Sequence, residues 1–267
     1  MELERAGVRL GQDEKVGLAV WTTTAWTVPS NVVCFPRHPR TRELARFDGF
    51  LSQAVAVSPD MRYSLVRPEK SPSSLLIVAT ERLAALSELL DSPLDTLASF
   101  LGYALLSTTY HDPLSSTFAS PPRPIIPADY VTATTGTGLV HTAPAHGVED
   151  WEAWRAYHVA QRDEEEGSSV GGAAPPPDTL CAVDAAGKLD ETMRAMGLDE
   201  DVVQRLIGKD VLGDGTAEVI RLLEERGRLL KEVEVEHKFP YDWRTKQPVI
   251  YRCVLSRVIF VVVLYGA

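Results

Sequence analysis

The stretch TGTGLVHTAPAHGVEDW, residues 135–151, predicts most of the local architecture and carries the densest chemistry of the chain. Two glycines, two histidines, a proline and an acidic pair lie between a short apolar step and the start of a helical pattern. Gly136 and Gly138 favour a sharp turn or the close approach of a ligand, because glycine adopts positive φ without steric penalty. From Val148 onward, apolar and aromatic residues recur at a spacing that favours a helix.

Asp150 falls in the first turn of that expected helix. The helix dipole stabilises a carboxylate there with or without a ligand, so helix electrostatics and ligand binding both remain open. His141 and His146 invite a metal interpretation, but they lie five residues apart across a proline, without an HExxH pair or a nearby cysteine. The glycines lack the third glycine of a dinucleotide fingerprint. We therefore expect neither a metal nor a dinucleotide here.

The composition is that of a globular protein. The 267 residues, 45% of them hydrophobic, suffice for one large domain or two small ones. The net charge of −10 argues against a free-standing binder held mainly by phosphate contacts, although local basic patches remain open. Three widely spaced cysteines form no disulfide framework and no metal spacing, which favours a reducing compartment.

Neither end of the sequence predicts targeting or membrane insertion. Residues 1–15 lack a signal-peptide apolar core and are too acidic for a transit peptide. The apolar run at residues 258–265 is much shorter than the roughly 20 residues of a membrane span. We expect a soluble chain with no membrane partner.

A second dense stretch, WTTTAWTVPSN at residues 21–31, follows an expected strand at residues 17–21. Three successive threonines fit an ordinary extended chain, because their branched side chains favour strands. The stretch also offers many neutral donors and acceptors, which suit a polar, uncharged group or a positioned water. The residues that supply them are Thr22, Thr23, Thr24, Thr27 and Asn31.

These two stretches, followed by YDWRTKQPVIYR at residues 241–252, resemble three successive signatures of one family. It is the editing, or connective peptide 1, domain of isoleucyl-tRNA synthetase, a class I aminoacyl-tRNA synthetase. Trp21 and Trp26 resemble the isoleucyl type, and HTAPAHGVED resembles the bacterial and mitochondrial branch. The resemblance covers most of residues 14–252. It implies a β-rich, barrel-like domain with peripheral helices, whereas periodicity alone predicts only mixed α and β structure.

The sequence departs from the family in several places. Ala25 stands where the family usually has proline. Residues 32–52 and 162–179 have the character of insertions into an editing domain that spans residues 1–252, and the second is acidic, then rich in glycine and proline. Residues 253–267 form a divergent tail without a family counterpart. The HIGH and KMSKS motifs of the ATP-dependent synthetic domain are not found in the sequence.

The resemblance implies hydrolysis of the ester that joins valine to isoleucine tRNA. It assigns catalytic roles to Thr22, Thr23, Thr24 and Asp150, with Asp150 pairing the substrate ammonium group. It assigns substrate-binding roles to Trp26, Thr27, Asn31, Gly136, Thr137, Gly138, His141 and His146. Among these, His141 helps to discriminate between amino-acid side chains. Direct attack by water is expected, with no metal and no cofactor. ATP would serve only the separate synthetic domain.

The implied partners are the acceptor end of isoleucine tRNA carrying valine and the remainder of the synthetase. The implied compartment is the mitochondrial matrix or, alternatively, the bacterial cytoplasm. An inactive fragment or a tRNA-contacting module remains an alternative to an active deacylase. An unrelated small-molecule hydrolase would require all three motif matches to be coincidental.

Overall fold

A computed structural model of the chain describes residues 15–29, 53–71, 74–115, 122–161, 181–233, 241–246 and 248–252, and the backbone of residues 33–34, 50–51 and 162–166. The first sheet has the order β1 (Lys15–Leu18), β6 (Ser74–Ala79), β5 (Arg62–Pro68), β7 (Leu94–Leu101). The second has the order β10 (Val140–Thr142), β4 (Ala54–Val57), β9 (Arg123–Pro127), β8 (Thr109–Tyr110).

The helices of the described chain surround these sheets. They are α2 (Leu83–Leu89), α3 (Val148–Glu166), α4 (Glu200–Leu206) and α5 (Asp214–Glu225), with short 3-10 turns η1 (Ala25–Thr27), η2 (Thr80–Arg82), η3 (Gly102–Leu105) and η4 (Glu191–Met196). The helix expected from Val148 is therefore confirmed as α3, and Asp150 lies in its first turn. None of the described helices has the length and apolarity needed to cross a bilayer.

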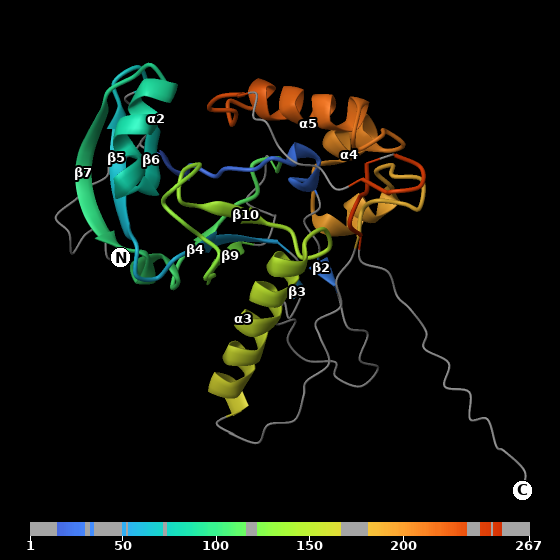
Figure 1. The fold of residues 1–267 in the computed structure, drawn as a ribbon, viewed down its shortest axis with the longest axis horizontal. Coiled ribbons are helices and arrows are strands. Elements are labelled where there is room, and N and C mark those ends of the chain that lie inside the picture. The colour runs from blue at the N-terminus through green and yellow to red at the C-terminus, as the bar shows by residue number, and fades with distance from the viewer. Residues whose placement is uncertain are drawn as a thin grey trace, which may run out of the picture.

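The inner strands β4 and β6 are covered on both faces, which explains their nearly continuous apolar sequence. Successive strand residues face opposite sides: along β6, Leu75 and Ile77 enter a core shared by the two sheets, while Leu76 and Val78 pack with α2 on the outer face. Along β4, Val55 faces the same shared core, and the alanines on the other side pack with Trp154 of α3. Figure 1 shows α2 against the first sheet and α3 leaving the second.

A separate apolar core, which we call the helical cluster, lies among η4, α4, α5 and η1. Figure 1 shows α4 beside α5, apart from α2. The main buried members of the helical cluster include Trp26, Val28, Met193, Val203 and Val219. Trp26 and Val28 come from the N-terminal threonine stretch. That stretch therefore packs against residues that lie far along the chain, not against the nearest sheet.

The expected mixed α and β structure is confirmed, but the described strands do not close into a barrel. The sheets meet at one corner, where Trp21 bridges Val140 of β10 just after β1 leaves the first sheet. At the opposite edges, β7 is the last strand of the first sheet and β8 is the last strand of the second, and the two do not pair with each other. Closure requires a continuous ladder around all strands, and the described ladder instead forms two open sheets packed face to face.

The expected insertions lie mostly outside the described residues. Within residues 32–52, the backbone of β2 (Val33–Cys34) pairs with β3 (Phe50–Leu51) in antiparallel register. Within residues 162–179, α3 continues through Glu166, so the first five positions are helical. The proposed tail at residues 253–267 falls outside the described chain.

Candidate functional site

The threonine loop, residues 21–29, is a compact turn held by its own side chains. The backbone N–H of Thr24 donates to Thr22 Oγ1 at 3.1 Å, and the Thr27 hydroxyl donates to the Thr24 carbonyl at 2.8 Å. Thr23 is exposed, Thr22 and Thr24 are partly exposed, and Thr27 is buried. The exposed hydroxyls are therefore those nearest the start of the loop.

His141 of β10 connects this loop to the second sheet. Its Nδ1 lies 3.4 Å from Thr27 Oγ1, and its Nε2 contacts the side-chain amide nitrogen of Gln53. Burial, with smaller contributions from His146 and Arg123, lowers the pKa of His141 to about 4. The imidazole is neutral at physiological pH, with both ring nitrogens engaged.

Asp150 lies at the other end of β10, where α3 begins. Its Oδ2 accepts the Ala143 backbone N–H at 2.8 Å, and its Oδ1 accepts the Tyr130 hydroxyl at 3.1 Å. Burial raises the pKa of this carboxyl, against the lowering effect of those two hydrogen bonds. None of the described Lys, Arg or His side chains forms an ion pair with it. The site thus contains a carboxylate that is held in place and has no charge partner in the part of the chain that the structure describes.

His146 lies between the two segments. Its ring packs edge-to-face on Trp26 with centroids 4.7 Å apart, and its Nδ1 lies 3.0 Å from the Tyr251 carbonyl oxygen. Burial lowers the pKa of His146 to about 4, with a further contribution from Arg252 and an opposing one from the Tyr251 carbonyl. The loop before α3 is thereby tied to the threonine loop and to the signature near residue 251.

The glycine stretch has a packing role in the structure. Gly136 and Gly138 have φ of 64° and 78°, as expected for a turn. A Cβ on Gly138 would lie 2.3 Å from the Cβ of Ala79, and one on Gly136 would lie 2.8 Å from Cγ of Trp21. Thr137 is buried, and its carbonyl accepts the Ala79 N–H. A substrate-binding role for these three residues stays a prediction, because the described contacts are internal.

The structure brings together most of the residues expected at the site. Side-chain contacts link threonines 22, 24 and 27 with His141, and Trp26 with His146. Asp150 adjoins His146 through the Ala143 backbone, which bonds to both residues. Trp26 is only 5% exposed and packs mainly in the helical cluster. Asn31 lies outside the described residues.

Sequence reasoning missed three contributors to this set, namely Gln53, Tyr130 and Thr142. The Thr142 hydroxyl lies 2.9 Å from the Tyr130 hydroxyl that donates to Asp150. Gln53 offers the clearest signal in retrospect, because it is a polar residue directly before the buried strand AVAV. A buried polar side chain in that position needs a hydrogen-bond partner.

The sequence is similar to isoleucine–tRNA ligases over nearly its whole length. The chain is 36% identical over 240 residues to the enzyme of Crocosphaera subtropica and 37% identical over 239 residues to that of Thermosynechococcus vestitus, and each match covers 89% of this chain and 20% of the relative. The enzyme of a Synechococcus strain is 36% identical over 249 residues, or 93% of this chain and 20% of the relative. No protein-family model matches.

Solved structures show which part of a synthetase adopts this fold. The crystal structure of GlLeuRS-CP1 matches with a TM-score of 0.56 at 17% identity, covering 88% of this chain and 89% of that one. The editing domain of the Plasmodium knowlesi cytosolic leucyl-tRNA synthetase matches with a TM-score of 0.52 at 10% identity, covering 84% and 86%. The chain belongs to the isoleucyl-tRNA synthetase family and has the fold of a synthetase editing domain.

This editing domain is of the bacterial type, since the relatives are cyanobacterial enzymes. They fit the bacterial alternative and give no support to a mitochondrial compartment. The chain spans 20% of the length of the relatives it matches. The activity, substrates and partners of a whole synthetase are therefore matters for proposal.

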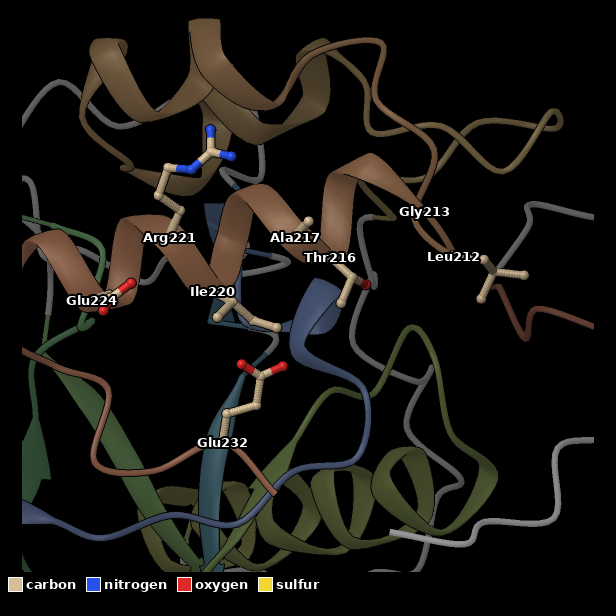
Figure 2. A pocket seen from close by; sticks show the side chains of 8 residues that line it. All are labelled: Leu212, Gly213, Thr216, Ala217, Ile220, Arg221, Glu224 and Glu232. Atoms are coloured by element: carbon tan, nitrogen blue, oxygen red, sulfur yellow. The ribbon is translucent and has the colours of Figure 1, made fainter. Parts of the chain in front are cut away.

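The editing domain also has a cavity of about 450 Å³ along α5. Figure 2 shows Ile220 and Thr216 pointing from α5 toward the space that Glu232 enters from the chain beyond the helix. None of the expected site residues lines this cavity. We place the candidate site at β10, where the hydrogen-bonded polar groups converge.

Several late basic residues, which could face a tRNA or serve as surface ion pairs, are engaged within the domain. Arg221 pairs with Glu218 at 2.9 Å, and Arg226 pairs with Asp199 at 3.0 Å. Arg244 stacks over the exposed Trp243 ring, 4.6 Å from its centroid. Arg221 and Arg226 therefore form ion pairs within the domain, while the Arg244 and Trp243 pair remains accessible to solvent.

Proposed function

We propose that this editing domain hydrolyses the ester linking valine to the terminal ribose of isoleucine tRNA. The single observation that carries the proposal is the buried Asp150 carboxylate, which the Tyr130 hydroxyl and the Ala143 N–H hold in place and which has no ion-pair partner among the described residues. The similarity to isoleucine–tRNA ligases supports the choice of tRNA. The substrate ammonium group supplies a cation for Asp150, and the remainder of a synthetase would deliver the acceptor end.

Asp150 serves as the anchor for the substrate ammonium group. A desolvated cation requires a paired anion, and the rigid carboxylate is positioned by Tyr130 and Ala143. Burial already makes its charged form costly in the empty site, so an arriving ammonium group lowers its pKa and gains a strong interaction. An amino acid lacking a free ammonium group would lose this attraction.

His141 forms part of the wall against the amino-acid side chain. Both its ring nitrogens are engaged and its pKa lies near 4, so it is poorly suited to accept a proton from water at neutral pH. One methylene distinguishes isoleucine from valine, and a binding pocket discriminates it by only about 1–3 kcal/mol, a limit for which isoleucyl-tRNA synthetases are the standard example. A rigid second site that excludes the larger side chain supplies the additional selectivity.

The chemical step is attack of water on the ester carbonyl. The water oxygen forms a bond to the acyl carbon, the bond from that carbon to the ribose oxygen breaks, and a proton passes from the water to the departing ribose oxygen. The hydroxyls of the exposed Thr23 and the partly exposed Thr22 and Thr24 orient the water and stabilise the developing oxyanion. The neighbouring ribose hydroxyl of the substrate assists the proton transfer.

Hydrolysis by the wild-type chain, Asp150→Asn and Asp150→Ala tests this proposal, with valyl and isoleucyl esters of isoleucine tRNA as substrates. Asparagine can accept the Ala143 N–H and donate to Tyr130, so it preserves the local bonds while removing the charge. We expect selective loss of valine in the wild type and a decrease of about a hundredfold or more in kcat/KM for both variants.

Folding is checked for each variant by circular dichroism and thermal unfolding. Equal rates in the wild type and Asp150→Asn would contradict the anchoring role. Binding of the tRNA without any hydrolysis by the wild type would instead favour a tRNA-contacting module.

A further inference from the structure

Gln53 is the least expected polar residue near the site. It immediately precedes β4 and is only 1% exposed. Its amide nitrogen donates to the Val28 carbonyl of the threonine loop at 3.1 Å and also contacts Nε2 of His141. One side-chain amide therefore connects the threonine loop with β10.

The direction of these hydrogen bonds determines where the imidazole proton lies. The Gln53 amide nitrogen carries two hydrogens, which suit its two acceptors. The same amide nitrogen that donates to the Val28 carbonyl also faces His141. Nε2 of His141 must therefore accept a hydrogen bond from Gln53. A neutral imidazole then carries its hydrogen on Nδ1.

The opposite side of the ring requires the same tautomer. The Thr27 hydroxyl donates its one hydrogen to the Thr24 carbonyl at 2.8 Å. It can therefore only accept from Nδ1 of His141, 3.4 Å away. The donors run in one direction, from Gln53 through His141 and Thr27 to the Thr24 carbonyl.

We propose that Gln53 is a positioning residue of the editing site, which holds His141 as the Nδ1–H tautomer and fixes its ring relative to the threonine loop. This inference rests on the proposed function, since it assigns Gln53 to selectivity for valine over isoleucine. Gln53 acts through His141 and does not touch the reacting atoms. Its loss should relax the wall against the larger side chain more than it slows hydrolysis of the valyl ester.

Two residues on other elements reinforce the neutral state of His141. Arg123 of β9 disfavours an imidazolium at all working pH values, and His146 of the loop before α3 does so when it is itself protonated. Gln53 is therefore the group best placed to choose between the two neutral tautomers. A glutamate at this position would accept rather than donate, so it would favour a hydrogen on Nε2 and stabilise the imidazolium.

The first test is nuclear magnetic resonance of the full chain labelled with ¹⁵N at histidine, with His141 assigned by comparison with His141→Gln. Long-range ¹H–¹⁵N correlations separate the Nδ1–H and Nε2–H tautomers. We expect Nδ1–H in the wild type. Observation of Nε2–H would overturn the proposal without any reliance on a Gln53 variant.

The second test compares Gln53→Glu with Gln53→Met, which is similar in length and lacks the donor. In Gln53→Glu the pKa of His141 should rise toward its ordinary value near 6.5, with the remaining neutral form carrying its hydrogen on Nε2. In both folded variants the preference for valyl over isoleucyl ester should decrease about tenfold, with a smaller change in kcat for the valyl ester.

The outcomes separate the two proposals. Unchanged selectivity and an unchanged tautomer in folded Gln53→Glu would overturn the positioning role. If the expected tautomers are observed but the chain does not hydrolyse valyl-tRNA, the positioning of His141 by Gln53 is supported. Only the proposed function is then refuted.

Discussion

The two segments that form the candidate site are stabilised by different cores. The Asp150 segment, residues 140–151, belongs to the sheet framework, because β10 pairs with β4 and the helix that follows inserts Trp154 beneath the second sheet. The threonine loop has one bridge to β10 and buries Trp26 and Val28 in the helical cluster. The anchor for the ammonium group and the hydroxyls for water thus depend on separate apolar cores, joined through His141.

The largest predicted effect is a loss of stability that acts on one core at a time. Trp154→Ala removes a side chain that is 1% exposed, and Met193→Ala removes a fully buried one from the helical cluster. We expect losses in the free energy of unfolding of about 3–5 kcal/mol for the first and about 2–5 kcal/mol for the second. Hydrogen exchange should accelerate preferentially at the Ala143 amide in Trp154→Ala and at the Thr27 amide in Met193→Ala.

Trp154→Phe is the matched control, because it keeps a ring in the core and removes an indole N–H that has no hydrogen-bond partner among the described residues. It should cost less stability than the alanine variant. Equal acceleration of both amides in both alanine variants would mean that the two segments open as one unit, and the distinction between the cores would fail.

A smaller effect concerns the glycine turn that precedes β10. Gly138→Ala combines positive φ with a Cβ that would lie 2.3 Å from Ala79, whereas Gly208→Ala has a similar φ of 77° and open space around its Cβ. Backbone strain should cost about 1–2 kcal/mol in each variant, and overpacking should add about 1–3 kcal/mol in Gly138→Ala alone. Chemical denaturation measures the difference.

Hydrolysis by the folded fraction of Gly138→Ala then separates packing from substrate contact. Unchanged KM for the valyl ester would leave the glycine with its packing role. A raised KM in a variant of normal stability would show that the turn contacts the substrate.

The smallest predicted effect is the pH dependence of folding stability that comes from the two histidines linking the segments. His141 and His146 have pKa values of about 4 in the folded chain, below the ordinary value of 6.5. Each therefore stabilises the fold fully above pH 6.5, and this contribution decreases as the pH falls toward 4. We expect a loss on the order of 1 kcal/mol per histidine, because both rings are partly exposed and solvent screens them.

Unfolding of the wild type, His141→Gln and His146→Gln between pH 7 and pH 4 measures this contribution. Asp150 acts in the opposite sense, since its raised pKa makes the folded chain relatively more stable as the pH falls. The difference between the wild type and each glutamine variant isolates the histidine. Identical pH profiles in all three proteins would contradict the lowered pKa values.

Local pattern predicted the local structure well. Apolar spacing placed the helix that begins at Val148, and its first turn carries Asp150 as expected. The glycines predicted positive φ at 136 and 138, because only glycine adopts that backbone freely. The expected mixed α and β domain is confirmed, and its described strands form open sheets, since closure of a barrel depends on which distant strand edges meet and the periodicity of one segment does not determine this.

The sequence by itself determined which segments carry the chemistry and which family the chain resembles, because motif identity and helical spacing are properties of neighbouring residues. Only the tertiary structure decided that Gln53 reaches His141 across 88 positions and that Tyr130 supports Asp150 across 20. It also decided that Trp26 is buried in the helical cluster. These outcomes depend on how strands register and how cores pack, which are cooperative properties of the whole chain and leave no local pattern to detect.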